Sequence, residues 1–219
     1  MMPVQDMLRT VIFDLDGTLI DSAPAILDSF AAVLAEHGLE PVAPLSHDLI
    51  GPPLAETLAR LSGRREPELI DSLATGFKRH YDTAGVLATQ PFPGVEAMLD
   101  AWSATGADLH ICTNKRYSVT RAILDHLEWA DRFVSVYSID LYDPRPAGKP
   151  QVLARQLNDQ KIDAAAAVYV GDRDEDGHAA AANGLPFYYA AWGYGGAGQG
   201  MPGCRRFDRP QDLVPGAVR

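Results

Sequence analysis

The segment RTVIFDLDGT spans residues 9–18 and opens on a short apolar run rich in β-branched and aromatic residues. Such a run predicts a buried strand, which here ends at Asp14. Asp16 follows two residues later, and in continuing extended backbone the two carboxylates point the same way and repel each other. The pattern therefore predicts a cation beside them, although two acids alone fit a solvated turn equally well.

Similar apolar runs recur along the chain, and segments with helical spacing of apolar residues lie between them. This alternation predicts an α/β fold with a doubly wound parallel sheet. In such sheets, ligands bind beyond the carboxyl ends of the strands. The further predicted strands are 107–112, 133–138, 166–171 and 186–190, and the predicted helices are 94–105, 117–128, 150–158 and 175–183.

One stretch interrupts the alternation, because residues 22–88 show the apolar spacing of helices only. An all-helical insert of this length after the first strand predicts a second, smaller domain. The segment Gln90-Pro-Phe-Pro-Gly94 carries two prolines and a glycine, as expected of a linker at a domain boundary. We predict an α/β core of residues 1–20 and 91–219 and a helical domain of residues 21–90.

Polar residues also follow the second predicted strand. Thr113, Asn114 and Lys115 place a hydroxyl group and free backbone amides there, which suits a phosphate oxygen. Lys149 stands alone in the sequence AGKP at the start of a predicted helix, where it can neutralise charge on a phosphoryl group. Taken separately, a helix cap explains Thr113 and a surface lysine explains Lys149.

A dense acidic group follows another predicted strand, where residues 171–176 read GDRDED. A hard cation with oxygen ligands needs such a group, although acids at a helix start are also favoured by the helix dipole. Asp176 comes four residues after Asp172 and so falls on the same helical face. The four features together, each at a strand end or a helix start, predict one site for a phosphate group and a divalent metal.

This set of motifs resembles that of the haloacid dehalogenase superfamily of phosphatases. The four motifs of that family are matched by DLDGT at 14–18, CTN at 112–114, Lys149 and GDRDED at 171–176, so the resemblance spans nearly the whole chain. It implies a Rossmann-like core. Asp16 points to phosphoryl chemistry, because dehalogenase members lack an acid at that position.

The helical insert is similar to the cap of the subfamily that includes phosphoglycolate phosphatase. Two other segments, Gly51-Pro-Pro-Leu54 and Trp192-Gly-Tyr-Gly195, also resemble those relatives. The glycine-rich run 193–203, which overlaps the second segment, is expected to form a loop bordering the active site. A cap that closes over the site would favour small soluble phosphomonoesters, phosphoglycolate among them.

The resemblance implies a role for each acid at the site. Asp14 would attack phosphorus in line and form an aspartyl-phosphate intermediate, while Asp16 would protonate the departing oxygen and then activate water. Asp14, Asp172 and the backbone carbonyl of Asp16 would hold Mg²⁺, which offsets the repulsion between a carboxylate and a phosphate dianion. Asp176 would act on the metal indirectly, through water or by orienting other groups.

The resemblance also implies roles for the polar and basic residues. Thr113 and Lys149 would complete the electrostatic cradle around the phosphoryl group. Asn114 and Lys115 would bind the substrate, and Lys115 could supply the cation that a substrate with a carboxylate needs besides the metal. Arg116, Lys78 or Arg79 would serve that purpose equally well, and the sequence alone places none of them.

The amino-acid composition argues against some classes of binding partner. Nineteen Lys and Arg stand against 29 Asp and Glu, and the formal charge of -10 argues against nucleic acid or an anionic membrane as the main partner. Two cysteines without metal-ligand spacing fit a reducing compartment. Because residues 1–10 lack a long apolar run, we expect a cytoplasmic protein whose partner is a small phosphorylated metabolite, present as a monomer or homodimer.

Two other functions fit part of the pattern. A phosphosugar mutase shares the nucleophile and the acid but returns the phosphoryl group to its substrate rather than to water. A receiver-type signalling domain also phosphorylates an aspartate at a strand end, yet it leaves the helical insert unexplained. The leading prediction is therefore a Mg²⁺-dependent phosphohydrolase.

Overall fold

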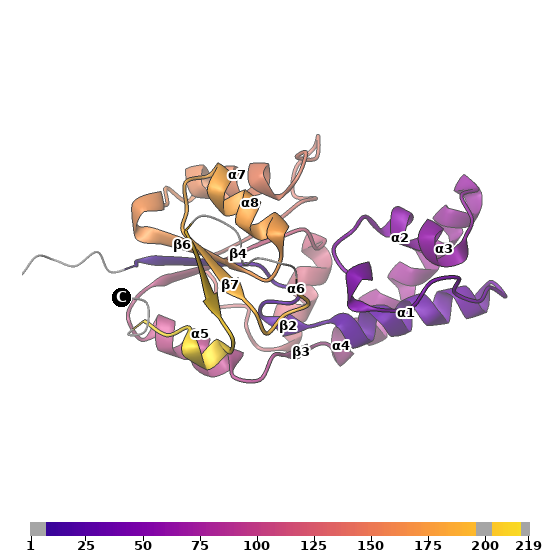
Figure 1. The fold of residues 1–219 in the computed structure, drawn as a ribbon, viewed down its shortest axis with the longest axis horizontal. Helices are drawn as coiled ribbons and strands as arrows, with labels where there is room; N and C mark the ends of the chain where they lie inside the picture. The colour runs from indigo at the N-terminus through magenta and orange to yellow at the C-terminus, as the bar shows by residue number, and fades with distance from the viewer. Residues whose placement is uncertain (1–7, 196–202, 216–219) are drawn as a thin grey trace, which may run out of the picture. The chain divides into compact units, whose positions relative to one another are not determined.

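The computed structural model describes residues 8–195 and 203–215. The chain divides into two compact units. The core unit contains the chain up to Asp21 and from Pro91 onwards, and the cap unit is Ser22–Gln90. Figure 1 shows the two units, with the core built around a sheet and the cap built from helices. The prediction of an α/β fold with a smaller helical cap inserted after the first strand is confirmed.

The core unit holds a six-stranded sheet in the order β5-β4-β1-β6-β7-β8. Every neighbouring pair is parallel. The strands are β1 (Thr10–Phe13), β4 (Asp108–Thr113), β5 (Ser135–Ser138), β6 (Ala167–Gly171), β7 (Phe187–Ala190) and β8 (Cys204–Phe207).

The order in which the chain adds strands to the sheet reverses at β1. From β1 the chain continues through β4 to β5 on one side, and it then returns to β6, β7 and β8 on the other side. Thr10 of β1 pairs with both Asp108 and Ala167, so the strands on either side of β1 are in register with it. The carboxyl ends of β1 and β6 flank the switch point where doubly wound folds bind ligands.

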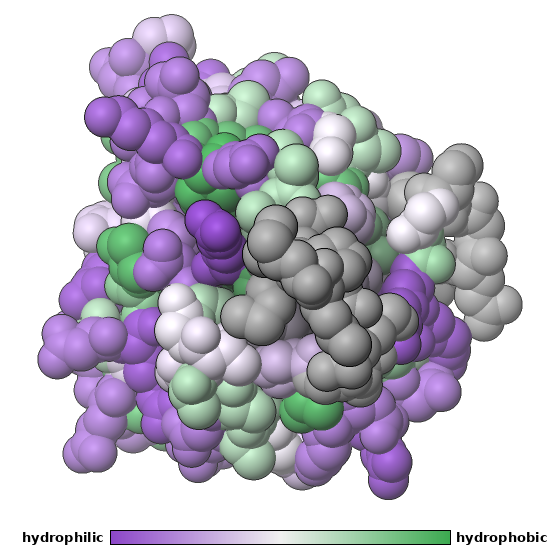
Figure 2. Space-filling view, turned by 90° about the vertical axis from the view of Figure 1, so that its left-hand side faces the viewer, coloured by the Kyte–Doolittle hydropathy of each residue, from purple (hydrophilic) through white to green (hydrophobic). Residues whose placement is uncertain are grey.

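Helices cover both faces of this sheet. They are α5 (Val95–Ser103), α6 (Tyr117–His126), α7 (Lys149–Asp159) and α8 (Asp174–Ala182). Figure 1 shows α7 and α8 on one face and α5 on the other. All four β1 side chains are consequently buried, as are those of β6, which explains the continuous apolar runs in both segments. Figure 2 shows mainly hydrophilic residues on the face at the left of Figure 1, as expected of a surface in water.

The cap unit is helical. It contains α1 (Ala23–Glu36), a 3₁₀ turn (His47–Leu49), α2 (Leu54–Ser62), α3 (Pro67–His80), a π-helical turn (Tyr81–Gly85) and α4 (Val86–Ala88). Aromatic rings join α1 to α3, since the ring centroids of Phe30 and Phe77 lie 4.5 Å apart. Pro67 opens α3, and Gly63 ends α2 in the left-handed conformation with φ 66°.

Some elements differ from the sequence prediction. The strand β8, the π-helical turn and the two-residue strands β2 (Ile20–Asp21) and β3 (Gln90–Pro91) were not predicted. β8 reads CRRF, and its two arginines hide the apolar alternation of a strand. Most of the glycine-rich run lies outside the described residues, at 196–202. Among the residues described, no helix combines the length and apolar character that crossing a membrane requires.

Candidate active site

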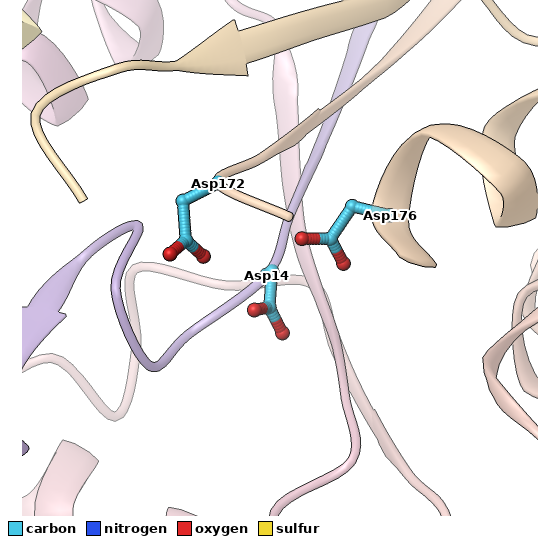
Figure 3. A group of neighbouring side chains, drawn as sticks. All are labelled: Asp14, Asp172 and Asp176. Carbon is cyan, nitrogen blue, oxygen red and sulfur yellow. The ribbon is translucent and has the colours of Figure 1, made fainter. Parts of the chain in front are cut away.

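Three carboxylates meet at the carboxyl edge of the sheet. Asp14 follows β1, Asp172 follows β6, and Asp176 lies in the first turn of α8. All three are buried, and one carboxylate oxygen from each lies within 4.8 Å of the others. Figure 3 shows the group, with Asp176 reaching from the helix toward the two acids at the strand ends. The acids therefore gather at the switch point of the sheet.

The side chain of Lys149 brings a positive charge into this group. It lies at the start of α7, is 4% exposed, and places Nζ 3.0 Å from Asp14 Oδ1 and 2.5 Å from Asp176 Oδ1. The other carboxylate oxygen of Asp176 accepts a hydrogen bond from the backbone NH of Arg173 at 3.0 Å. Asp176 thus fixes Lys149 to the start of α8, beside Asp14.

Burial dominates the ionisation of these groups. It raises the pKa of Asp14 to about 8, opposed by Lys149 and reinforced by Asp176 and Asp172. Burial also raises the pKa of Asp172 to about 7, and Asp176 adds to that shift. Burial alone would lower the pKa of Lys149, but Asp14 and Asp176 outweigh it and raise this pKa well above its usual value. Asp14 and Asp172 therefore lack enough nearby positive charge to offset their burial.

The donor set fits a hard divalent cation such as Mg²⁺. Carboxylate oxygens are its preferred protein ligands, and a second cation would stabilise the charged forms of Asp14 and Asp172, whose pKa values are raised by burial and further by neighbouring acids. Asp172 is already oriented, because its Oδ1 accepts a hydrogen bond from Thr18 Oγ1 at 3.3 Å and its Oδ2 from the Tyr194 NH at 2.9 Å. The structure brings together the two side chains predicted as metal ligands.

Asp16 and Lys115 form an ion pair at the same edge of the sheet. Lys115 Nζ donates to Asp16 Oδ1 at 2.9 Å and to Oδ2 at 3.2 Å, and the two side chains are 7% and 17% exposed. Asp16 lies in a tight turn that Gly17 closes with φ 87°, a conformation that favours glycine. The residue predicted to bind substrate thus contacts the residue predicted as the acid and base.

Thr113 and Asn114 stand at the end of β4, beside β1. Thr113 is buried, and its hydroxyl oxygen accepts a hydrogen bond from the backbone NH of Lys115 at 3.2 Å. Asn114 Nδ2 donates to Glu175 Oε1 at 2.8 Å, while Asn114 Oδ1 is buried without a hydrogen-bond partner among the described residues. Both residues are outside the group of three acids, and their roles toward a phosphate stay predictions.

Sequence reasoning gave no role to three residues that shape the site. Thr18 and Tyr194 hold the Asp172 carboxylate, and Glu175 holds Asn114. Thr18 belongs to the first motif, so its position was a usable signal. Tyr194 belongs to the segment Trp192-Gly-Tyr-Gly195, whose contact with Asp172 no local pattern reveals.

Comparison with known proteins identifies the family of the chain. A family model described as haloacid dehalogenase-like hydrolase matches residues 11–190. A solved haloacid dehalogenase-like family hydrolase from Streptococcus pneumoniae superimposes with a TM-score of 0.81 at 24% identity, covering 94% of this chain and 97% of that one. The chain therefore belongs to the haloacid dehalogenase-like hydrolases, and the predicted resemblance is confirmed.

Curated relatives define its place in the family more closely. A phosphoglycolate phosphatase of Xylella fastidiosa is 37% identical over 192 residues, which cover 85% of this chain and 81% of the relative. A tyrosine-protein kinase, PtkA of Mycobacterium tuberculosis, is 33% identical over 191 residues, covering 86% of this chain and 64% of that protein. Within the family the chain is a phosphoglycolate phosphatase-like phosphatase, that is, a phosphoric monoester hydrolase.

Proposed function

We propose that the protein hydrolyses small phosphomonoesters with Mg²⁺ and forms an aspartyl-phosphate on Asp14. The observation that carries this proposal is the buried group of Asp14, Asp172 and Asp176 at the switch point, with Lys149 against Asp14. A buried carboxylate next to an ammonium group and two further acids is arranged to receive a phosphoryl group together with a metal.

Two steps follow from the proposed roles. An Asp14 oxygen forms a bond to phosphorus while the ester P–O bond breaks, and Asp16 gives its proton to the leaving oxygen. Asp16 then takes a proton from water, the water oxygen attacks phosphorus, and the bond to Asp14 breaks to release inorganic phosphate. Mg²⁺ held by Asp14, Asp172 and the Asp16 carbonyl would supply positive charge to the phosphoryl oxygens. Lys149 and Thr113 would stabilise the same charge.

The substrate and cellular setting belong to the same proposal. The relatives named phosphoglycolate phosphatase support a small phosphorylated metabolite, with phosphoglycolate as the first compound to test. We propose that residues 21–90 act as a cap domain on a core of residues 1–20 and 91–219, excluding bulk water when substrate binds. A cytoplasmic location and a monomer or homodimer complete the proposal.

Phosphate release from a substrate panel tests the function. The panel contains phosphoglycolate, sugar phosphates, nucleotides and pyrophosphate, each assayed in Mg²⁺, after exhaustive chelation, and after Mg²⁺ is restored. We expect phosphate from small monoesters, its loss on chelation because the acids lack positive charge, and its return with Mg²⁺. Full activity in chelator would contradict the metal role. Isomerised sugar phosphate without free phosphate would favour a phosphosugar mutase.

The Lys115→Met variant tests how the ion pair with Asp16 contributes. Because Lys115 holds both oxygens of the Asp16 carboxylate, its loss should lower kcat about 10-fold to 100-fold by releasing the acid and base from position. KM should change far less. Lys115→Arg, which keeps the charge, should recover part of kcat. A raised KM with an unchanged kcat would instead place Lys115 on the substrate.

A further inference from the structure

Tyr194 contacts Asp172, Asp21 and Phe92 within the core unit. Its backbone NH donates to Asp172 Oδ2 at 2.9 Å, and its hydroxyl group donates to Asp21 Oδ1 at 3.0 Å. Its ring lies 6.0 Å from the ring of Phe92, centroid to centroid. One residue therefore contacts a carboxylate of the candidate metal site and two residues on other segments of the chain.

Those two segments are the ends of the core that connect to the cap unit. Asp21 is the last core residue before the chain enters Ser22–Gln90, and Phe92 is the second core residue after the chain returns. The Phe92 NH donates to the Leu19 carbonyl oxygen at 3.1 Å, so the two connections are hydrogen-bonded to each other within the core unit. Tyr194 therefore contacts both connections through its side chain and contacts Asp172 through its backbone NH.

The residues next to Tyr194 keep it close to the site. Trp192 Nε1 donates to the Thr18 carbonyl oxygen at 2.9 Å. Gly193 is packed so tightly that a Cβ added there would lie 2.1 Å from the Gly17 carbonyl oxygen and 2.5 Å from Asp172 Cβ. Only glycine fits at that position, and the segment 192–194 therefore lies directly against the turn after β1 and against Asp172.

We propose that Tyr194 is a positioning residue that ties the orientation of Asp172 to the two chain connections of the cap. The phenol ring and the hydroxyl group of Tyr194 hold its backbone in place. Because the backbone is held, the Tyr194 NH donates its hydrogen bond to Asp172 in a fixed direction. Any displacement of Asp21 or Phe92 is thereby passed to a carboxylate of the metal site. This inference rests on the proposed role of Asp172 as a metal ligand.

Binding of Mg²⁺ to the full-length, substrate-free protein tests the proposal. Tyr194→Phe removes the hydroxyl group but keeps the ring and the backbone NH, and Asp21→Ala breaks the same bond from its other end. Each should raise the Kd for Mg²⁺ in calorimetric titration about 10-fold, the low end for residues that orient metal ligands. The double variant should bind no more weakly than either single variant, because both remove one interaction.

Tyr188→Phe is the matched control. It makes the same chemical change in β7, where the ring packs on Phe207 with centroids 5.3 Å apart, and it should leave the Kd unchanged. The Mg²⁺ concentration for half-maximal rate should rise in Tyr194→Phe, while kcat at saturating Mg²⁺ recovers toward the parent value.

Two outcomes would overturn the proposal. One is a lower melting temperature in Tyr194→Phe with an unchanged Kd for Mg²⁺, since Tyr194 would then serve only stability. The other is a Kd for Mg²⁺ that stays at the parent value in Asp21→Ala, which decides the matter if the Tyr194 variants do not fold. A parent protein that binds Mg²⁺ but releases no phosphate would contradict the proposed function without contradicting this inference.

Discussion

Asparagine in place of Asp14 is expected to lower kcat at least about 10⁴-fold, equivalent to about 5.5 kcal/mol of activation free energy. The amide has nearly the same shape as the carboxylate but is a poor nucleophile, so no bond to phosphorus forms. The fold should persist, because Asp14 is 5% exposed and a neutral group loses less hydration there than a charged one. Lys149 keeps Asp176 as its charged partner.

The measurements are single-turnover phosphate release and thermal unfolding followed by circular dichroism. Asp108→Asn is the matched control, since it makes the same change at the exposed amino end of the neighbouring strand β4 and should leave both readings unchanged. In Asp16→Asn, acid quenching after brief mixing with p-nitrophenyl phosphate should trap one phosphoryl group that hydroxylamine removes from Asp14. Retention of more than about one hundredth of the parent kcat in Asp14→Asn would point to direct attack by water.

Methionine in place of Lys149 is expected to cost both stability and activity. The ammonium group lies against Asp14 and Asp176. Above about pH 8, where Asp14 is ionised, removal of the ammonium group leaves these two buried carboxylates without their cation. Breaking a buried ion pair in this way costs about 3–5 kcal/mol of unfolding free energy. In Mg²⁺, kcat should fall about 10²-fold to 10³-fold, because a preorganised charge next to Asp14, the proposed nucleophile, is lost.

Denaturant unfolding in chelator and steady-state kinetics in Mg²⁺ separate the two effects. Adding Asp176→Asn to Lys149→Met should recover part of the lost stability, because one unpaired charge is gone, while kcat stays low. Lys161→Met, at an exposed site just beyond the end of α7, should match the parent in both measurements. A Lys149→Met variant as stable as the parent would show that the two acids are not charged together in the metal-free protein.

Local patterns were enough to predict most of the fold. The strands β1, β4, β6 and β7 are buried apolar runs of the kind that parallel sheets require, and α5 to α8 show the helical spacing of their buried faces. β8 escaped prediction because Arg205 and Arg206 occupy an edge strand, where burial is incomplete. The π-helical turn at Tyr81–Gly85 continues α3, and no residue type marks the change of helix geometry.

The candidate site was predictable where each residue directly follows a strand. Asp14 and Asp172 have that place in the sequence, Thr113 is the last residue of its strand, and the parallel sheet brings their positions to one edge. Contacts made by long side chains or by loops were not predictable. The pairing of Lys115 with Asp16 and the contact of Tyr194 with Asp172 depend on the direction of side chains and backbone after folding, which spacing in the sequence does not encode.

Because β1 lies in the middle of the sheet, it can pair only with strands that are synthesised later. β1 is made first, yet its neighbours β4 and β6 begin only at Asp108 and Ala167, after the helical insert. The cap closes its contacts within Ser22–Gln90 and is complete on the emerging chain long before that. Strand β1, which Asp14 follows, therefore leaves the ribosome without either partner, and the three acids can assemble only once residue 176 of 219 has been translated.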